Sequence, residues 1–484
     1  MRVVNKYFDK YRKLSAPIKA SFWFMVCGVL QKGISVISTP IFTRLLSTTE
    51  YGVYSVYCSW QSILSIFVTL NLSAGVFTRG LVKNENDADG FTSAFLGLAI
   101  CLTVIASIVY YIFNDFWNSI FNMNTFMISC MLITMLNNTV FGFWSTRQRV
   151  AYRYKALVCL TLFTSVLQPI ISVVGIYLFP DAKVEARVFA IALIGVFTYW
   201  GLAFNQIRKN GQLFSLNYWK YALRFNIPLV PHYLSQSMLS SSDRIMIGHF
   251  CSAADAGIYS LAYSLSMLMT IINTAVTNTF SPWLYQNIRD KKYREIGSVS
   301  YFLLVVIALA NLFLIAFAPE IVALFAPYEY SDAVNAIPPI AMTVFFMFMY
   351  TMFANFSFYF AKTKAIAITS FVGAVLNVLL NAIFIPIYGY MAASYTTLIC
   401  YICYAIGHFV LMRQISKKYM ENVEIYNLRI LVLLSISFIA CGFCIKFLYR
   451  YFLVRYILIV LVVLFVLFHR DRILRLLRSM NSAF

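Results

Sequence analysis

Charged side chains within the long apolar stretches of this 484-residue chain are the residues best placed to bind a charged ligand. Lys32 interrupts the first stretch, and Arg44 lies near its end. A charge at the centre of a membrane helix costs about 2.5–3.5 kcal/mol on insertion scales, and such charges usually mark the pathway of an ion or a substrate. A second interpretation of Lys32 stays open, in which it extends to the interface, pairs with a carboxylate, or lies in a span whose bounds differ from those predicted.

Asp243 and Arg244 form a second charged position, near the end of a later apolar stretch. Successive residues of a helix point about 100° apart, so these two side chains do not simply neutralise each other. We therefore expect at least one of them to face a lumen or the other half of the protein. An ion pair at the membrane interface is the alternative.

Hydroxyl and amide side chains accompany these charges. Gln31, Ser35, Ser38 and Thr39 lie in the stretch that holds Lys32, and six serines or glutamines fall between 235 and 242. A cavity that is cationic and rich in hydroxyl groups suits an anionic or sugar-bearing substrate better than an organic cation. For Asn377 and Asn381 in a later stretch, we expect hydrogen bonds between helices instead.

The sequence contains few motifs that would indicate a metal site or a nucleotide-binding site. Cys400 and Cys403, like Cys441 and Cys444, have the spacing of zinc ligands, but each pair lies in an apolar stretch without a second pair. The four histidines are scattered, and no nucleotide-binding P-loop occurs. We expect no metal, no cofactor and no direct hydrolysis of ATP, and the short connections leave no room for a catalytic domain, so the chain is not expected to be an enzyme.

The composition defines the elements that position these residues. The chain is 61% hydrophobic and 12% charged, whereas a soluble domain is about 25% charged. Soluble enzymes, disordered chains and disulfide scaffolds are thereby excluded, and the sequence predicts an all-α polytopic membrane protein. Runs long enough to span a membrane give about 14 transmembrane helices, at 19–42, 51–75, 91–113, 121–143, 156–178, 187–207, 225–247, 257–281, 298–318, 334–360, 365–386, 389–412, 428–448 and 452–469.

The net charge of +20 reflects topology. With both termini in the cytoplasm, most of the 38 lysines and arginines fall on the cytoplasmic side, as the positive-inside rule requires. The connection at 449–452 fits least well, because Lys446, Arg450 and Arg455 lie outside. Residues 1–18 read as a basic interfacial segment on anionic lipid, with no cleavable signal peptide.

The chain also resembles itself at an offset of about 205 residues. Ser47–Glu50 and Ser252–Asp255 correspond in this alignment, and both resemble helix capping boxes. We predict two pseudo-symmetric six-helix lobes at 19–210 and 211–412, followed by a helix pair and a basic tail at 413–484. An even number of spans in each lobe predicts a pseudo-two-fold axis along the membrane normal.

Two segments resemble a known family. Residues 39–46 with 50–54, and residues 242–248 with 256–260, are similar to the first and seventh spans of Wzx-type polysaccharide flippases, which belong to the multidrug/oligosaccharidyl-lipid/polysaccharide exporter superfamily. The resemblance implies alternating access between two lobes in the bacterial cytoplasmic (inner) membrane. It also implies transfer of an undecaprenyl-diphosphate-linked oligosaccharide from the inner to the outer leaflet, for O-antigen, capsule or related glycans.

The same resemblance gives the cations roles. Lys32, Arg44 and Arg244 are expected to attract the diphosphate, with Asp243 orienting Arg244 or its lobe. Arg79 and Arg147 are expected to help loading at the inner mouth, although positive-inside charges need no further reason. The implied partners are the undecaprenyl diphosphate carrier, membrane lipids and glycan polymerase machinery, without nucleic acid.

Three rival functions remain. A multidrug cation exporter of the same superfamily would place acidic residues within its lobes, whereas Asp243 is the carboxylate that lies well within a span. A lipid-II-type flippase is compatible with the architecture. A polysaccharide polymerase or ligase generally carries a large outward loop, and no such loop is predicted.

Overall fold

The computed structural model describes residues 15–468, a range that folds into helices joined by short turns, without a strand. The prediction of an all-α polytopic membrane protein is confirmed. Residues 1–14 of the predicted interfacial segment lie outside the described residues, as does most of the basic C-terminal tail. The chain divides into two compact units, residues 1–237 and 238–484.

Unit 1, residues 1–237, contains six long helices and several short ones. They are α2 (Ala16–Leu45), α3 (Thr48–Val68), α4 (Gly75–Lys83), η1 (Glu85–Asp87), α5 (Ala88–Ile112), α6 (Asn114–Phe121), α7 (Thr125–Val150), α8 (Tyr154–Leu178), α9 (Lys183–Lys209), α10 (Leu216–Asn226), η2 (Ile227–Leu229) and the start of α11 (Val230–Phe250).

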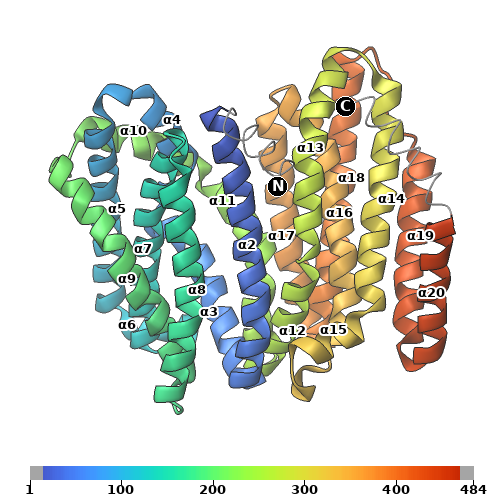
Figure 1. Cartoon of the computed structure of the whole chain (residues 1–484), viewed down its shortest axis with the longest axis horizontal. Coiled ribbons are helices and arrows are strands. Elements are labelled where there is room, and N and C mark those ends of the chain that lie inside the picture. The colour runs from blue at the N-terminus through green and yellow to red at the C-terminus, as the bar shows by residue number, and fades with distance from the viewer. Residues whose placement is uncertain (1–14, 469–484) are drawn as a thin grey trace, which may run out of the picture. The chain divides into compact units, whose positions relative to one another are not determined.

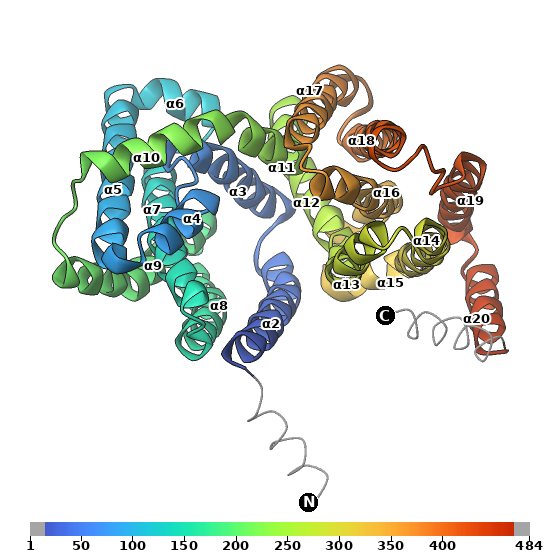
Figure 2. The same ribbon diagram turned by 90° about the horizontal axis from the view of Figure 1, so that it is seen from above.

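Within unit 1, α5, α7, α8 and α9 run alongside one another, as Figure 1 shows. By contrast, α10 crosses the ends of α5 and α4 (Figure 2). The hydroxyl of Tyr218 in α10 donates a hydrogen bond of 2.7 Å to Asp87 in η1. This bond to a carboxylate raises the pKa of Tyr218. Although α10 follows the predicted lobe boundary at residue 210, it packs within unit 1.

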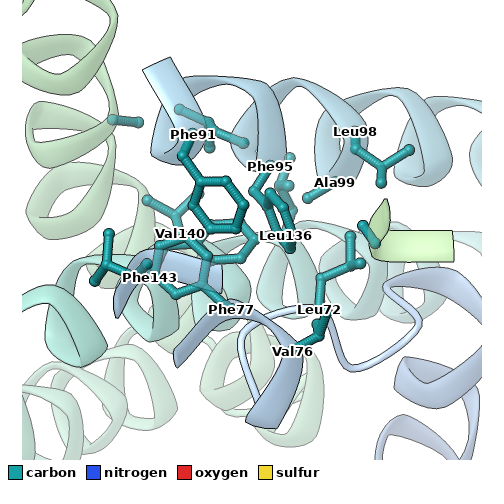
Figure 3. Packing of buried hydrophobic residues seen from close by; sticks show 14 of the residues in the cluster. Leu72, Val76, Phe77, Phe91, Phe95, Leu98, Ala99, Leu136, Val140 and Phe143 are labelled. Carbon is teal, nitrogen blue, oxygen red and sulfur yellow. The ribbon is translucent and has the colours of Figure 1, made fainter. Parts of the chain in front are cut away.

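An aromatic cluster holds α4 against α5 and α7 (Figure 3). The ring centroids of Phe77 and Phe143 lie 4.7 Å apart, and those of Phe91 and Phe95 lie 4.4 Å apart. Each such pair contributes about 0.5–1.5 kcal/mol beyond the burial of its surface. Specific packing of this kind matters in a membrane, because lipid tails are as apolar as the side chains and burial alone drives helices together weakly.

Unit 2, residues 238–484, begins within α11. Its further helices are α12 (Ala253–Ser266), α13 (Met269–Arg289), α14 (Tyr293–Ala316), α15 (Ala318–Phe325), η3 (Tyr328–Tyr330), α16 (Ala333–Tyr359), α17 (Thr363–Tyr388), α18 (Met391–Tyr419), α19 (Leu428–Phe447), η4 (Leu448–Arg450) and α20 (Phe452–Phe468). The core helix is α16, which contacts α12, α13, α14, α17, α18 and α19 (Figure 2).

Every predicted span overlaps a helix in the described residues, although residues 69–74 of the span 51–75 lie in the turn between α3 and α4. Eleven helical segments there are long and apolar enough to cross a membrane. The three predicted spans that are not among these eleven segments are 51–75, 225–247 and 452–469. They correspond to α3, the serine-rich α11 and the shorter α20. The predicted span 257–281 is divided at Met267 and Leu268, where α12 ends and α13 begins. The two pseudo-symmetric lobes stay a prediction.

The two predicted capping boxes differ in one contact. Ser47 accepts a hydrogen bond from the Glu50 backbone, and the Glu50 carboxylate accepts one from the Ser47 backbone N–H at 2.7 Å. Ser252 likewise accepts from the Asp255 backbone, but the Asp255 carboxylate accepts from the Ser252 hydroxyl instead. Aspartate is one methylene shorter than glutamate, and here its carboxylate binds the nearer hydroxyl.

Two of the cations near the predicted connection at 449–452 form specific contacts with other side chains of unit 2. Arg455 is 3% exposed and forms an ion pair with Glu320 of α15, to which Tyr456 also donates a hydrogen bond of 2.6 Å. The ammonium of Lys446 donates to the Tyr395 hydroxyl at 3.0 Å. Two of the cations that fitted the positive-inside rule poorly are therefore engaged in contacts within unit 2.

Candidate functional site

A polar pocket of about 280 Å³ lies within unit 1, between α2, α3, α8 and α9. The α2 side contributes residues three or four apart, and the α8 side does the same, so one face of each helix lines the pocket. The lining residues are Gln31, Ile34, Ser35, Ser38, Phe42, Tyr54, Ser165, Gln168, Pro169, Ser172, Arg187 and Ile191.

The two sides of the pocket meet through an amide and a hydroxyl. Gln31 of α2 donates a hydrogen bond of 3.3 Å to Ser165 of α8. Pro169 lies inside α8 and has no N–H, so the carbonyl one turn earlier loses its helical partner. The pocket therefore offers neutral hydrogen-bonding groups, and no carboxylate is among its lining residues.

Arg187 supplies the positive charge of this pocket. Its guanidinium carbon lies 3.6 Å from the ring centroid of Phe42 and 3.6 Å from that of Tyr54, so two aromatic rings pack against it. The residue is 9% exposed, and its Nε and Nη1 atoms are buried without a hydrogen-bond partner. Cation–π contacts contribute about 2 kcal/mol when desolvated, but they leave the N–H groups at the edge of the guanidinium unsatisfied.

Lys32 and Arg44 lie on α2, outside the lining of this pocket. Lys32 follows Gln31, so it points about 100° away from the pocket face, and its side chain is exposed. Arg44 is also exposed, and its Nη1 donates to the Pro40 carbonyl at 2.9 Å. The structure thus places both predicted cations on one helix, with accessible side chains.

Asp243 lies at the centre of a hydrogen-bond network in unit 2. The residue is 1% exposed. Its Oδ1 accepts a hydrogen bond of 2.6 Å from Asn381, and its Oδ2 accepts bonds from Tyr259 at 2.6 Å and Thr397 at 2.8 Å. These donors come from α12, α17 and α18, so the carboxylate joins three helices to α11. No cation of the described residues forms an ion pair with it.

The expected interhelical role of Asn377 and Asn381 is confirmed. Asn377 accepts a hydrogen bond from Ser242 at 3.0 Å and donates to Thr397 at 3.2 Å. Asn381 donates to Asp243 and accepts from Thr396. Both asparagines are fully buried, and their side chains complete the network around the carboxylate.

Arg244 contacts different residues from those that surround Asp243. Its guanidinium carbon lies 4.1 Å from the centroid of the Tyr263 ring, and its Nη1 donates to the Ser240 carbonyl at 3.0 Å. The residue is half-buried. Asp243 and Arg244 thus face different surroundings, as the angle between successive helix residues predicts.

The two predicted loading residues lie apart from the polar pocket. Arg147 of α7 forms an ion pair of 2.5 Å with Asp89 and donates to Gln206 at 2.6 Å. It lines a second pocket of about 370 Å³, which also contains Arg153, Lys209 and Glu85. Arg79 is exposed, 5.8 Å from the ring of Phe225.

Sequence reasoning missed Arg187 as a site residue and found Asp243 without its partners. Arg187 is the fifth residue of α9, and the assignment of cations to the two sides of the membrane places it among the ordinary cations of an outer connection. The one signal was its position among apolar neighbours. The partners of Asp243 are 16, 138 and 154 residues away, which no local spacing reveals.

The fold and these polar centres define an all-helical membrane transporter of the multidrug/oligosaccharidyl-lipid/polysaccharide exporter superfamily. The chain belongs to the polysaccharide biosynthesis protein family, whose profile matches residues 18–288. The MatE family profile matches residues 228–383. The predicted resemblance to polysaccharide flippases is confirmed, and the protein is a flippase or transporter of this type.

Two relatives from Haemophilus influenzae align with most of the chain. A protein of the Lsg locus is 20% identical over 378 residues, which is 74% of this chain and 89% of that protein. A membrane protein is 20% identical over 427 residues, covering 84% of this chain and 98% of that protein.

Solved structures show the same fold. The lipid II flippase MurJ in an inward closed conformation aligns with a TM-score of 0.67 and 14% identity, covering 93% of this chain and 99% of that one. An inward-facing multidrug resistance MATE family transporter aligns with a TM-score of 0.60 and 16% identity, covering 80% and 96% of the two chains. At these identities the likeness concerns the fold alone.

Proposed function

We propose that this protein moves undecaprenyl-diphosphate-linked oligosaccharide repeat units from the inner to the outer leaflet of the bacterial cytoplasmic membrane. The product would supply O-antigen, capsular or related polysaccharide synthesis. The two helical units would alternate access to the two sides of the membrane. Membership of the polysaccharide biosynthesis family supports the substrate class.

The sign of the accessible charge within the spans is the observation that carries this proposal. Lys32 and Arg44 are exposed cations on a membrane-spanning helix. Other carboxylates of the described helices lie in first turns or helix ends, whereas Asp243 lies deep within α11 and already accepts three hydrogen bonds. Accessible positive charge with an occupied carboxylate favours an anionic substrate over a cationic drug.

The predicted site residues take their roles from this arrangement. Lys32, Arg44 and Arg244 attract the diphosphate, whose oxygens accept charge-assisted hydrogen bonds. Asp243 acts on its own unit rather than on Arg244, since its three partners tie α11 to neighbouring helices. Neutral amides and hydroxyls contact the sugars.

Arg79 and Arg147 serve loading at the cytoplasmic mouth in this proposal. The pocket beside Arg147 also holds Arg153 and Lys209, so it offers several cations to a diphosphate head group. The ion pair with Asp89 positions Arg147 without removing the net positive charge of that pocket.

A lipid-II-type flippase is the second candidate function. The fold of MurJ covers nearly the whole chain, and both substrates would join sugars to a polyprenyl diphosphate. A multidrug exporter is less well supported, because the buried carboxylate is not free to meet a cation.

The glycan polymerase machinery is the proposed partner in the membrane.

Deletion and complementation test the proposal. A strain without the gene should accumulate the lipid-linked oligosaccharide on the inner leaflet and lose surface glycan. Lys32→Ala and Arg44→Ala should fail to restore the glycan at normal protein levels, because the accessible charges that attract the diphosphate are gone. Arg289→Ala removes a surface cation of unit 2 and should restore it fully. Full export by both α2 variants would exclude these residues from the site.

A further inference from the structure

We propose that the pocket between α2, α3, α8 and α9 binds a phosphate-class oxyanion, with Arg187 as its charged ligand. This site is separate from Lys32, Arg44 and Arg244, and the inference does not depend on which substrate the protein moves. The ligand is either the phosphate group of a lipid or free phosphate, which share the same chemistry.

The charge of Arg187 has no counter-charge within the described part of the protein. Of the nearest carboxylates along the chain, Glu185 accepts a hydrogen bond of 3.0 Å from Asn124. Glu50, one turn before Tyr54, caps α3 and pairs with Lys183 at 3.4 Å. A buried charge without a partner is strongly unfavourable, so the site is incomplete without an anion.

The stacking of Arg187 determines which anion fits. The ring centroids of Phe42 and Tyr54 both lie 3.6 Å from the guanidinium carbon, so the two rings take up the space against it and leave its N–H groups to a ligand. The Nε and Nη1 atoms have no hydrogen-bond partner. A guanidinium N–H group donates charge-assisted hydrogen bonds to phosphate oxygens, and such a ligand would satisfy an arginine that has no other anion.

The rest of the pocket suits the same ligand. Ser35, Gln168 and Ser172 add neutral hydrogen-bonding groups, and no acidic side chain lines the pocket to repel an anion. One water occupies about 30 Å³ in the liquid, so a pocket of about 280 Å³ holds an oxyanion with its remaining hydration.

A purely structural role explains these features less well. Cation–π contacts with Phe42 and Tyr54 would also hold a purely structural arginine, but they do not account for the polar pocket that opens beside it. The carboxylates of Glu185 and Glu50 are engaged with other residues. The arrangement leaves its charge for a ligand.

The test uses the full-length protein, with the midpoint of thermal unfolding followed by intrinsic fluorescence. In one arm, detergent-solubilised protein receives sodium phosphate or sodium chloride at equal ionic strength. In the other, the protein is placed in phosphatidylcholine nanodiscs with or without a polyprenyl phosphate. The variants are Arg187→Met, Arg187→Lys and Gln168→Leu, and Arg289→Met is the matched control.

We expect phosphate to stabilise the wild type and Arg289→Met, and chloride to have no such effect. Arg187→Met should abolish the response, and Arg187→Lys should weaken binding about tenfold because the planar fork is lost. If Arg187→Met does not fold, the same measurement on Gln168→Leu tests the site. This variant loses one hydrogen bond to the ligand, so we expect it to bind phosphate about fivefold more weakly.

Stabilisation by free phosphate identifies free phosphate as a ligand. Stabilisation only by the polyprenyl phosphate, again through Arg187, assigns the site to a lipid phosphate group. The proposal is overturned if neither arm shows a response, if chloride is equally effective, or if the response persists in Arg187→Met. Unchanged binding in Gln168→Leu also overturns the assignment to this pocket.

Discussion

Asp243 is a buried carboxylate without an ion-pair partner among residues 15–468, so it depends on its hydrogen bonds, and it has three of them. Tyr259, Asn381 and Thr397 all donate, and Asn381 is itself held by Thr396. Such networks stabilise a fold when every member is satisfied and destabilise it when one is removed. Asp243 is therefore a structural centre of unit 2 as well as a candidate functional residue.

Asp243→Asn should destabilise the protein although the side chain keeps its size. An amide has one accepting oxygen in place of two, so at least one of the three donors loses its acceptor, at a cost of about 1–3 kcal/mol. The midpoint of thermal unfolding in detergent measures the effect. Glu421→Gln, which breaks the exposed ion pair with Lys291, is the control and should leave the midpoint unchanged. Equal midpoints for Asp243→Asn and wild type would refute the network.

Single charged residues were only partly predictable from the sequence. Lys32 and Asp243 were found because an ionisable residue in an apolar stretch violates the composition around it. Arg187 was missed because it lies near the start of α9, where cations are common. Its burial comes from Phe42 and Tyr54, which reach it from α2 and α3, and the spacing along α9 contains no trace of that contact.

At the scale of elements, the C-terminal helix pair is joined to the rest of unit 2 by few polar contacts. Arg455 of α20 pairs with Glu320 of α15, and its guanidinium carbon lies 5.2 Å from the ring of Tyr456. Tyr449, just before α20, donates to the Ile315 carbonyl at 2.7 Å. These contacts fix the start of α20, whose residues 452–461 are largely exposed and apolar.

Arg455→Met should loosen α20 without unfolding unit 2. The variant leaves the half-exposed Glu320 without its cation, and we expect a loss of about 1–3 kcal/mol at this contact. Hydrogen exchange at the amides of residues 452–461 should accelerate, while exchange in α16 stays unchanged. The double variant Arg455→Met, Glu320→Gln should recover most of the protection. Acceleration throughout unit 2 would instead assign Arg455 a role in the whole fold.

The long helices were predictable and the short ones were not. Each long apolar run became a helix because length and hydropathy decide membrane spans almost alone. The helices α4, α6, α10 and α15 have 8 to 11 residues, too few to span a membrane. The break at Met267 and Leu268 was also missed, since both residues are apolar and neither proline nor glycine marks the position.

At the scale of the whole molecule, the distribution of charge predicts the membrane topology. The chain carries a net charge of +20, and its lysines and arginines gather at one set of connections. Arg455 and Lys446, which lie on the predicted outer side against the positive-inside rule, form contacts with other residues of unit 2. Their contacts give these two cations a structural role, and the cytoplasmic location of both termini stays a prediction.

Labelling of single cysteines tests this orientation. The helix α9 has 27 residues and is about 40 Å long, so the connections at its two ends lie on opposite sides of a membrane. In a cysteine-free variant, we expect Asp181→Cys to react with a membrane-impermeant maleimide in intact cells. Gln212→Cys should react only after permeabilisation, because the positive-inside rule predicts that Arg208 and Lys209 keep that end in the cytoplasm. The reverse pattern would invert the topology, and with it the side from which Arg79 and Arg147 could load a substrate.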